Sequence, residues 1–370
     1  MTTADVLVIG GGPAGAAAAA RLAAGGLRVT LCERQAEPGR QVCGEFVSAA
    51  ATAELAAFGV EPGGLGARPI TRARVCGQGS EVTSRLPFTG YGLSRARLDR
   101  SLLESAARCG ADVRIGVGVR TIERGRGAWS VALSEGDRIE SGAVVLATGK
   151  HDLRGHARAS SSAPPMVGFK MHCRLRPDQA AALRDAVELF PYDGGYAGLQ
   201  LIDSGVANLC FVMDADRVRG DGHAWQNALS HLRKAAPPLA DRLRDARPLW
   251  NRPASIARVP YGYVCAADAS MEGLYRVGDQ AAVIPSLAGE GIAIALRSAR
   301  HAADAVLAGH AATSYVAAFR SDVLGPMRGA RLVESLLGRR LLRRFGLGLA
   351  TVPGVVSLLV RVTRLPASPV

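Results

Sequence analysis

Short apolar runs alternate with glycine turns and helix-forming segments along the chain, and the clearest example comes first. Residues 4–9 (ADVLVI) are almost all apolar, which predicts a short buried strand. A glycine turn occupies residues 10–15, and the Ala-rich run 16–24 is typical of a helix. Residues 27–32 (LRVTLC) predict a second strand, which ends on Glu33. This order and spacing indicate a βαβ unit.

The remaining pattern predicts a parallel sheet and a second, antiparallel sheet. Alternation over residues 72–88 indicates a hairpin, and the apolar spacing over 96–109 indicates a helix. Residues 166–215 are strand-like, with a helix expected near 177–188. Further elements are expected as a helix over 224–246, a strand at 273–279, a helix at about 290–307 and a mostly helical remainder. Strands that alternate with helices, together with an antiparallel stretch, predict an α/β fold with a second sheet domain.

Composition narrows the class of protein without choosing a partner. The chain has 370 residues, of which 48% are apolar and 21% charged, which excludes a disordered chain. Lys and Arg number 45 against 32 Asp and Glu, a formal charge of +13. This balance keeps nucleic acid, anionic membranes and anionic cofactors as candidate partners.

The cysteines and the N-terminus indicate a reducing compartment. The seven cysteines are scattered, and none forms a Cys-x-x-Cys pair, which argues against a disulfide framework and against a structural zinc site. No metal site is predicted. The start of the chain has no basic region before its apolar run, unlike a signal peptide. We therefore expect a cytoplasmic protein.

The first glycine turn has the spacing that dinucleotides require. Gly10 permits the tight turn, Gly12 permits close approach of a pyrophosphate, and Gly15 permits the helix to pack on the strand. Glu33, at the end of the second strand, can accept hydrogen bonds from ribose hydroxyls, and its charge argues against NADP. The alternative is a glycine-rich turn with no ligand, which the complete strand–turn–helix context disfavours.

A second glycine segment separates FAD from NAD. An apolar strand ends in Gly278-Asp279, Pro285 follows, and Gly289-Glu290-Gly291 opens an Ala-rich helix. A simple NAD dehydrogenase needs no such site so far along the chain, whereas an extended FAD does. Asp279 can accept from a ribityl hydroxyl, and the helix N-terminus at Gly291 can stabilise negative charge on a reduced flavin.

Taken together, these motifs resemble those of the p-hydroxybenzoate hydroxylase and geranylgeranyl reductase superfamily of FAD-dependent proteins. The residues that carry the resemblance are Gly10, Gly12, Pro13, Ala14 and Gly15, then Glu33-Arg34, Arg95-x-x-Leu98-Asp99, Gly278-Asp279, Pro285, Gly289 and Gly291. The resemblance implies that Arg95 contacts the flavin nucleotide, that Asp279 binds the ribityl chain and that Val119 offers its backbone to the adenine. An ordinary salt bridge at the helix start is the alternative for Arg95 and Asp99.

The resemblance also implies a discontinuous domain organisation. The predicted FAD-binding domain is Rossmann-like and comprises residues 1–70, 92–150 and 266–310. An antiparallel substrate-binding sheet domain comprises 71–91 and 151–265, and a helical C-terminal segment comprises 311–370.

Residues 42–47 (VCGEFV) supply the candidate catalytic groups. In geranylgeranyl reductases, a Cys-Gly-acidic stretch in this region lies beside the flavin ring, so the resemblance places Cys43 on the flavin face. Cys43 can donate a proton there, and Glu45 can relay one if it is buried. The alternative is a loop in which Cys43 only packs.

Four further residues are candidates: Tyr196 on the substrate side, and Lys170, His172 and Tyr261 as acid/base groups. Tyr196 is the expected substrate-pocket residue, and it keeps the tyrosine of a reductase motif whose bulky positions here become Gly198 and Gln200. Lys170 and His172 alternate on one strand face, which we expect to face solvent.

Two reactions are consistent with this reading. We favour monooxygenation of a small aromatic or polyketide-like natural product by reduced FAD and O2, with NAD(P)H as the electron donor. Reduction of carbon–carbon double bonds in an isoprenoid-like lipid is the alternative, which the Cys43-Gly44-Glu45 stretch suggests. The aspartate that hydroxylases carry in an Ala-Asp-Gly stretch is missing from residues 147–150 (ATGK), which weighs against rapid reduction by NAD(P)H. A flavin-binding protein without turnover is the third, least favoured option.

The C-terminal tail is basic and apolar. Residues 331–370 carry seven arginines and one acid, Glu334, around an uncharged run at 345–360. The run is shorter than the about 20 residues that cross a bilayer. Two interpretations stay open: a helix pair that covers the two domains, which we favour, and a peripheral membrane contact. Nucleic-acid binding is not expected, because the arginines lack interleaved aromatics and no nucleic-acid motif is present.

Overall fold

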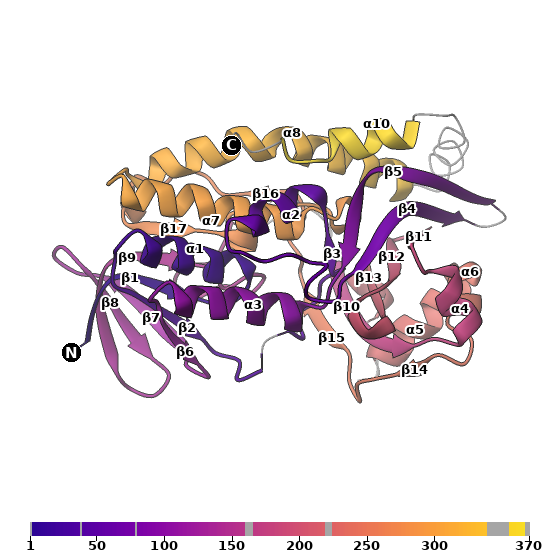
Figure 1. Ribbon diagram of the computed structural model, residues 1–370, viewed down its shortest axis with the longest axis horizontal. Helices are drawn as coiled ribbons and strands as arrows, with labels where there is room; N and C mark the ends of the chain where they lie inside the picture. The colour runs from indigo at the N-terminus through magenta and orange to yellow at the C-terminus, as the bar shows by residue number, and fades with distance from the viewer. Residues whose placement is uncertain are drawn as a thin grey trace.

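Two β-sheets lie side by side along the long axis of the molecule, with long helices covering one of them (Figure 1). The computed structural model describes residues 2–37, 39–77, 80–159, 166–218, 224–338 and 355–366. The predicted α/β class, with a Rossmann-like unit, a second sheet and a helical C-terminal segment, is confirmed. The domain boundaries given above stay a prediction.

The first sheet grows from the βαβ unit that the sequence predicts. Its strand order is β6-β2-β1-β9-β8-β7, with β17 also paired to β9. β1, β2, β6, β9 and β17 run parallel, whereas β8 pairs antiparallel with β7 and β9. The strands are β1 (Thr2–Ile9), β2 (Val29–Glu33), β6 (Asp112–Ile115), β7 (Val119–Arg124), β8 (Trp129–Leu133), β9 (Arg138–Leu146) and β17 (Leu274–Arg276).

Helix α1 (Pro13–Ala24) is the centre of the largest core. Ala14 and the alanines at 16–20 are almost fully buried, and their small side chains let α3 (Arg95–Arg108) and α7 (Gly291–Leu307) pack closely against it. This packing fixes the two glycine segments, because α1 and α7 each begin directly after one of them.

The second sheet is mainly antiparallel. Its order is β14-β10-β13-β12-β11-β4-β5-β3, with β15 also paired to β10. The strands are β3 (Phe46–Val47), β4 (Arg68–Gly77), β5 (Ser80–Gly92), β10 (Met166–Arg174), β11 (Ala186–Tyr192), β12 (Gly195–Leu201), β13 (Ala207–Asp214), β14 (Arg247–Pro248) and β15 (Ala254–Ala257). A separate pair is formed by β16 (Tyr263–Val264) and β18 (Ala282–Val283). Helices α4 (Pro177–Ala182), α5 (Ala224–Ala235) and α6 (Pro237–Arg242) lie beside this sheet, and residues of α5 and α6 share its core.

Three more helices hold the C-terminal part of the chain on the first domain. α2 (Ala49–Ala56), α8 (Ala312–Gly338) and α10 (Val355–Val362) lie with α7 on the same side of the molecule (Figure 1). Arg297 on α7 is almost fully buried, and its guanidinium binds Glu54 of α2, Asp322 of α8 (2.9 Å) and the Pro366 carbonyl (3.0 Å). This network ties three segments distant in sequence to one helix.

Two predicted helices were wrong in extent. The helix expected near 177–188 ends at residue 182, and strand β11 begins at 186, because Val187, Leu189 and their neighbours alternate between the two faces of the sheet. The helix expected over 224–246 is broken at Pro237, which has no amide hydrogen to continue α5 and instead starts α6. In the predicted uncharged run 345–360, residues 345–354 lie outside the described residues.

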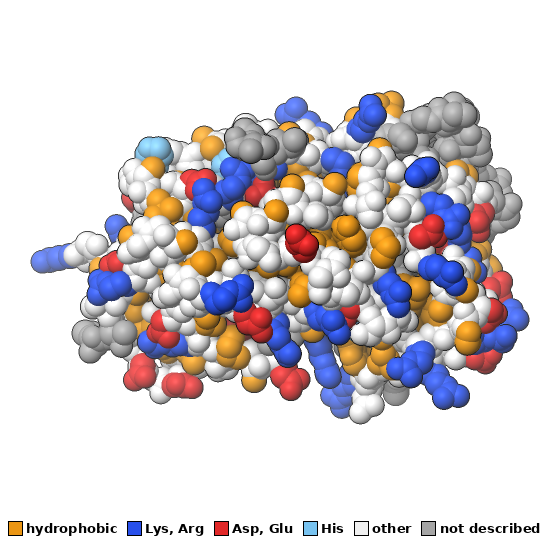
Figure 2. Space-filling model, viewed as in Figure 1, with side chains coloured by type: hydrophobic (Ala, Val, Ile, Leu, Met, Phe, Trp, Pro, Cys, Tyr) orange, Lys and Arg blue, Asp and Glu red, His pale blue; other side chains and the backbone are white. Residues whose placement is uncertain are grey.

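The excess positive charge is spread over the surface. On the face shown in Figure 2, Lys and Arg side chains are interleaved with Asp and Glu side chains. Across the part of the chain that the structure describes, no helix combines the length and hydropathy needed to cross a membrane.

Candidate functional site

A cavity of about 570 Å³ lies between the two sheets, and both glycine segments line it. The first segment contributes Gly12, Pro13 and Ala14, and the second contributes Gly278, Asp279, Gly289 and Gly291. Residues separated by more than 250 positions therefore meet at one site, as the sequence reading of an extended cofactor requires.

The first glycine turn has the backbone geometry that its sequence predicts. Gly10 has φ of 107°, and a Cβ there would lie 2.4 Å from the Ala147 carbonyl oxygen. A Cβ on Gly15 would lie 1.9 Å from the Gly10 carbonyl oxygen, so α1 packs on β1 only with glycine there. At Gly12, by contrast, the nearest atom is the tip of Arg95, at 3.2 Å, beside the cavity.

The predicted adenosine end lies at the edge of the first sheet. The Glu33 carboxylate is buried and accepts hydrogen bonds from the Gly11 amide (2.6 Å) and the Gln35 amide (2.8 Å). Arg34 follows it, near the strand start that carries Val119. Val119 does not line the cavity. Glu33, Arg34 and Val119 thus lie beyond the end of the cavity that the first glycine turn lines.

Asp279 and the start of α7 form the other end of the cavity. The Asp279 carboxylate lies 2.8 Å from the Lys150 ammonium. Burial by itself lowers the pKa of Lys150, but the neighbouring Asp279 outweighs it and raises the pKa. Pro285 begins a short 3-10 turn before Gly289, which has φ of 67°. A Cβ on Gly291 would meet nothing within 4 Å, so the first turn of α7 is open to a ligand.

These features fit FAD. The cavity joins an open helix N-terminus at Gly12 to another at Gly291, which suits a long cofactor with an anionic pyrophosphate and a ring that becomes anionic when it is reduced. The wall between them carries Arg95, Lys150 and Asp279, which supply donors and an acceptor for phosphate and hydroxyl groups.

The segment Cys43-Gly44-Glu45 lies across the second sheet as a fixed turn. Glu45 has φ of 57°, a left-handed conformation that is uncommon outside glycine. Asn208 donates from its side-chain amide to the carbonyls of Cys43 (3.1 Å) and Gly44 (2.8 Å). Gln200 donates to the Glu45 carbonyl at 2.9 Å. These bonds hold the strained turn and present Cys43 to the cavity, which it lines.

The Glu45 side chain is fully buried in a cluster of donors. Its oxygens lie 2.5 Å from the Lys170 ammonium and 2.6 Å from His172 Nε2, and one also accepts from the Arg95 amide at 2.8 Å. Burial raises the pKa of Glu45, but Lys170 and His172 outweigh it and the net effect lowers the pKa. Glu45 is therefore held as a carboxylate, a poor proton donor at neutral pH.

The expectation that Lys170 and His172 face solvent was wrong. They do share one strand face, but that face looks inward, and Lys170 has no exposed surface. The burial is tolerated because Glu45 supplies the opposite charge. Sequence periodicity gives the shared face but not its direction, because the partner carboxylate lies more than 120 residues away.

The strand register explains how the sheet builds this site. His172 pairs with Asn208, which pairs with Gln200, so three polar side chains form one row across β10, β13 and β12. The next row joins Lys170, Cys210 and Gly198. The first row binds the turn at residues 43–45, and Cys210 and Gly198 line the open cavity beside it.

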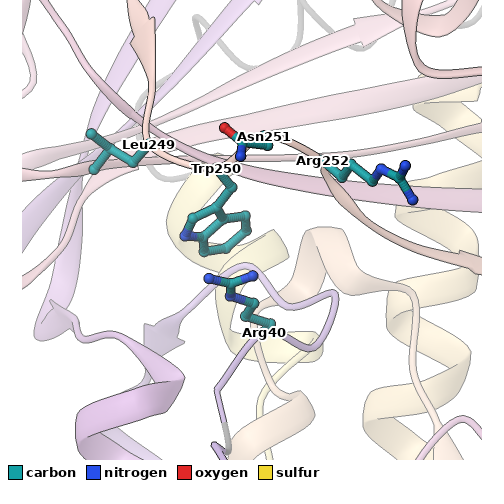
Figure 3. A pocket seen from close by; sticks show the side chains of 5 residues that line it. All are labelled: Arg40, Leu249, Trp250, Asn251 and Arg252. Atoms are coloured by element: carbon teal, nitrogen blue, oxygen red, sulfur yellow. The ribbon is translucent and has the colours of Figure 1, made fainter.

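A surface pocket of about 400 Å³ lies behind this cluster. Figure 3 shows the Arg40 guanidinium close to the Trp250 ring, and the two are 5.6 Å apart. Trp250 also packs against His172, with ring centroids 4.4 Å apart, and lies 5.6 Å from the Lys170 ammonium. Trp250 therefore shields the buried ion pair from solvent.

Arg95 joins the helix salt bridge to the site. Its guanidinium binds both oxygens of the fully buried Asp99, at 2.7 and 2.8 Å. Burial by itself lowers the pKa of Arg95, but Asp99 and Cys43 outweigh it and raise the pKa. Arg95 lines the cavity beside Gly12, so the salt bridge also orients a cation toward it.

Tyr196 lines the cavity, but its hydroxyl is already engaged. It bonds to the Ser286 hydroxyl and accepts from the Leu287 amide at 3.0 Å, and Tyr261 also bonds to Ser286 at 2.7 Å. Burial raises the pKa of Tyr196 well above its usual value. Tyr196 therefore acts here as a neutral hydrogen-bonding group that joins the second sheet to the start of α7.

Sequence reasoning did not find Asn208, Trp250 or Lys150 as site residues. The sequence does carry a signal for Asn208, because it is the one polar residue in the otherwise apolar run at 207–213 (ANLCFVM). Trp250 and Lys150 carry no pattern of their own.

Comparison with known proteins supports the cofactor assignment. Residues 4–173 match the family model described as pyridine nucleotide-disulphide oxidoreductase. The chain is 26% identical to a menaquinone reductase of Mycolicibacterium smegmatis, over 83% of this chain and 77% of the relative. It is 29% identical to a digeranylgeranylglycerophospholipid reductase of Thermoplasma volcanium, over 82% and 78%.

The fold is shared with solved flavoproteins. The structure of the flavin-dependent brominase Bmp2 superposes with a TM-score of 0.77 at 17% identity, covering 98% of this chain and 93% of that one. Both nucleotide motifs, the cavity that joins them and these relatives agree. In sequence and in fold, the chain is therefore similar to FAD-dependent oxidoreductases of the kind expected from its motifs, the p-hydroxybenzoate hydroxylase and geranylgeranyl reductase superfamily.

Proposed function

We propose that this protein is a FAD-dependent reductase of carbon–carbon double bonds in an apolar, isoprenoid-like substrate. The observation that carries the proposal is the substrate wall of the cavity. Its lining from the second sheet is largely aliphatic, formed by Ala73, Leu86, Val187, Leu189, Val212 and Ile256. Such a wall binds a hydrocarbon chain by removing its surface from water.

Two polar groups on this wall are already used within the protein. The Gln200 amide donates to the Glu45 carbonyl, and the Tyr196 hydroxyl bonds to Ser286 and Leu287. Neither group is then free to bond the oxygen of a phenolic ring, which needs hydrogen-bond partners of its own. The relatives that match most of the chain carry the names of reductases, which supports the same choice.

When bound and first reduced by the electron donor, the flavin would supply a hydride, and so two electrons, for one carbon of the double bond. The chain must then hold the alkene in place, exclude water and provide a proton for the other carbon. Cys43 is the proposed proton donor because it lines the cavity, and the Glu45 amide donates to its Sγ at 3.3 Å. The buried Glu45–Lys170 pair holds that turn in position and does not itself donate.

We further propose which residues hold the cofactor. Gly12, Pro13, Ala14 and Arg95 would face the pyrophosphate, Glu33 and Val119 the adenosine, and Asp279 with the start of α7 the ribityl chain and ring. NAD(P)H is the proposed electron donor, and the protein is proposed to act in the cytoplasm.

Monooxygenation of a small aromatic or polyketide-like compound is the second candidate. One observation favours it: a Cβ on Gly198 would have only ordinary contacts, at 3.8 Å, so the wall has room for a ring at this point. The same experiment separates the two reactions.

The bound flavin is reduced by dithionite without oxygen, and a lipid with a geranylgeranyl chain is added. The reductase gives a product two hydrogens heavier before any oxygen is admitted, and in D2O both are deuterium, because dithionite supplies only electrons. A phenolic substrate is then tested with labelled O2. Label in the product, with no anaerobic reduction of the lipid, would overturn the proposal in favour of monooxygenation.

A further inference from the structure

Helix α10 has two opposed faces with different surroundings. Val360 and, just after the helix, Arg364 line the cavity. Leu358 and Val362, four residues apart and so on one face, are 59% and 44% exposed. Because residues two apart point to nearly opposite sides of a helix, Leu358 and Val362 face away from the cavity that Val360 lines.

The end of α8 continues this exposed apolar face. The two helices touch closely, since a Cβ on Gly329 would lie 2.3 Å from the Val362 carbonyl oxygen. Leu332, one turn beyond Gly329, is 59% exposed. Among the described residues, Leu332, Leu358 and Val362 are half of the large hydrophobic side chains that are exposed, and they gather along one seam.

The inner side of this segment is anchored, so its outer side is held in place. Arg364 forms an ion pair with the buried Glu290 and lies 4.7 Å from the Phe88 ring. The Pro366 carbonyl accepts from Arg297 at 3.0 Å. The exposed leucine and valine therefore do not turn inward to join the core.

The charge around the seam favours an anionic bilayer over a second copy of the chain as its partner. Arg328, one turn before Leu332, and Arg361, between Leu358 and Val362, are exposed, and Glu334, the only acid in the described part of α8 and α10 beyond residue 322, is partly buried. A second copy of the chain would bring like charges together across a two-fold contact. An anionic bilayer instead accepts both the arginines and the aliphatic side chains.

We propose that the seam of α8 and α10, formed by Leu332, Leu358, Arg361 and Val362, docks on an anionic lipid bilayer. The same helix separates the bilayer from the cavity, so an apolar substrate would pass around α10 without crossing water. This last step rests on the proposed function, whereas the docking does not.

The test is sedimentation of the full-length, FAD-loaded protein with vesicles. The vesicles are phosphatidylcholine alone, or phosphatidylcholine with phosphatidylglycerol. We expect wild type to pellet with the anionic vesicles, and the double variant Leu358→Ser/Val362→Ser to bind roughly tenfold more weakly. Arg361→Glu should weaken binding about fivefold or more. Leu307→Ser, at another exposed leucine (41%), is the matched control and should bind like wild type.

Several results would overturn the proposal. These are wild type that stays in solution with anionic vesicles, a double variant that pellets as well as wild type, or equal binding to uncharged vesicles. Self-association in analytical ultracentrifugation that the double variant abolishes, without vesicle binding, would instead identify a second copy as the occupant. Flavin absorbance and melting temperature check that each variant folds. Because sedimentation needs no turnover, a failure of the proposed reaction leaves this result readable.

Discussion

The Lys170 ammonium lies 2.5 Å from the Glu45 carboxylate, and neither side chain has exposed surface. The pair joins β10 of the second sheet to the turn that presents Cys43 to the cavity. A buried pair of this kind contributes little net stability compared with apolar residues, but it is costly to break. Its value here is positional: it holds a non-glycine residue in a left-handed conformation at the edge of the site.

Removal of one partner should therefore destabilise the protein strongly. Lys170→Met leaves Glu45 with His172 as its remaining side-chain partner, and we expect a loss of about 3 kcal/mol in the free energy of unfolding. Denaturant unfolding measures it. The double variant Glu45→Gln/Lys170→Met should recover part of the loss, since no charge is then left unpaired. A single variant as stable as wild type would contradict the buried-pair interpretation.

The acid stability of the protein should depend on Glu45. Its pKa in the folded state is lowered below the ordinary value of 4.5, because Lys170 and His172 outweigh burial. A lowered pKa gives stability that is present above the unfolded pKa and is lost as the pH falls through the folded pKa. Glu45→Gln should flatten the decline in unfolding free energy below about pH 4.5, relative to the exposed control Glu123→Gln. Identical slopes in both variants would exclude this role.

Glu334 should have the opposite effect. Burial raises its pKa to about 7, although Arg331 partly opposes this. The folded state then prefers the protonated acid, so the protein pays a growing cost in stability as the pH rises from about 4.5 to 7. Glu334→Gln should raise the melting temperature at pH 8 and change it little at pH 4. A gain of the same size at both values would point to a cause other than ionisation.

Two glycines of the first turn should respond differently. Gly12→Val places a side chain at the cavity, where only the end of Arg95 is near, so the protein should fold but lack the flavin spectrum. Gly15→Ala places its Cβ 1.9 Å from a backbone oxygen, so it should impair folding itself. Circular dichroism and flavin absorbance separate the two outcomes. Wild type that is colourless and takes up no added FAD would contradict the cofactor site.

Support of the turn by Asn208 should matter for turnover. Asn208→Ala removes the hydrogen bonds to the Cys43 and Gly44 carbonyls, so the turn should lose its fixed position while the flavin stays bound. We expect turnover to fall at least about tenfold, since small displacements of a reacting group have large effects on rate. Cys43→Ala should fall at least as far if the thiol donates the proton. Turnover equal to wild type in Cys43→Ala would leave Cys43 as a packing residue only.

The sequence by itself determined the nucleotide half of this protein. The βαβ unit, the glycine spacing at Gly10, Gly12 and Gly15, and the second segment around Asp279 and Gly291 are local features. These features depend on the conformational freedom of glycine and on a short strand–turn–helix order. Both properties can be read from residues that are neighbours in the sequence. For this reason the fold class and the FAD assignment follow from the chain alone.

Only the tertiary structure decided which side chains meet around the turn at residues 43–45. Glu45, Lys170, His172, Gln200 and Asn208 come from four separate segments, and their meeting depends on strand order, register and the direction in which a sheet face points. Alternation shows that Lys170 and His172 share a face of the strand. The same alternating pattern results whether that face meets solvent or a buried carboxylate. The choice is made by long-range pairing of charges in a low-dielectric interior, an interaction that leaves no local pattern in the chain.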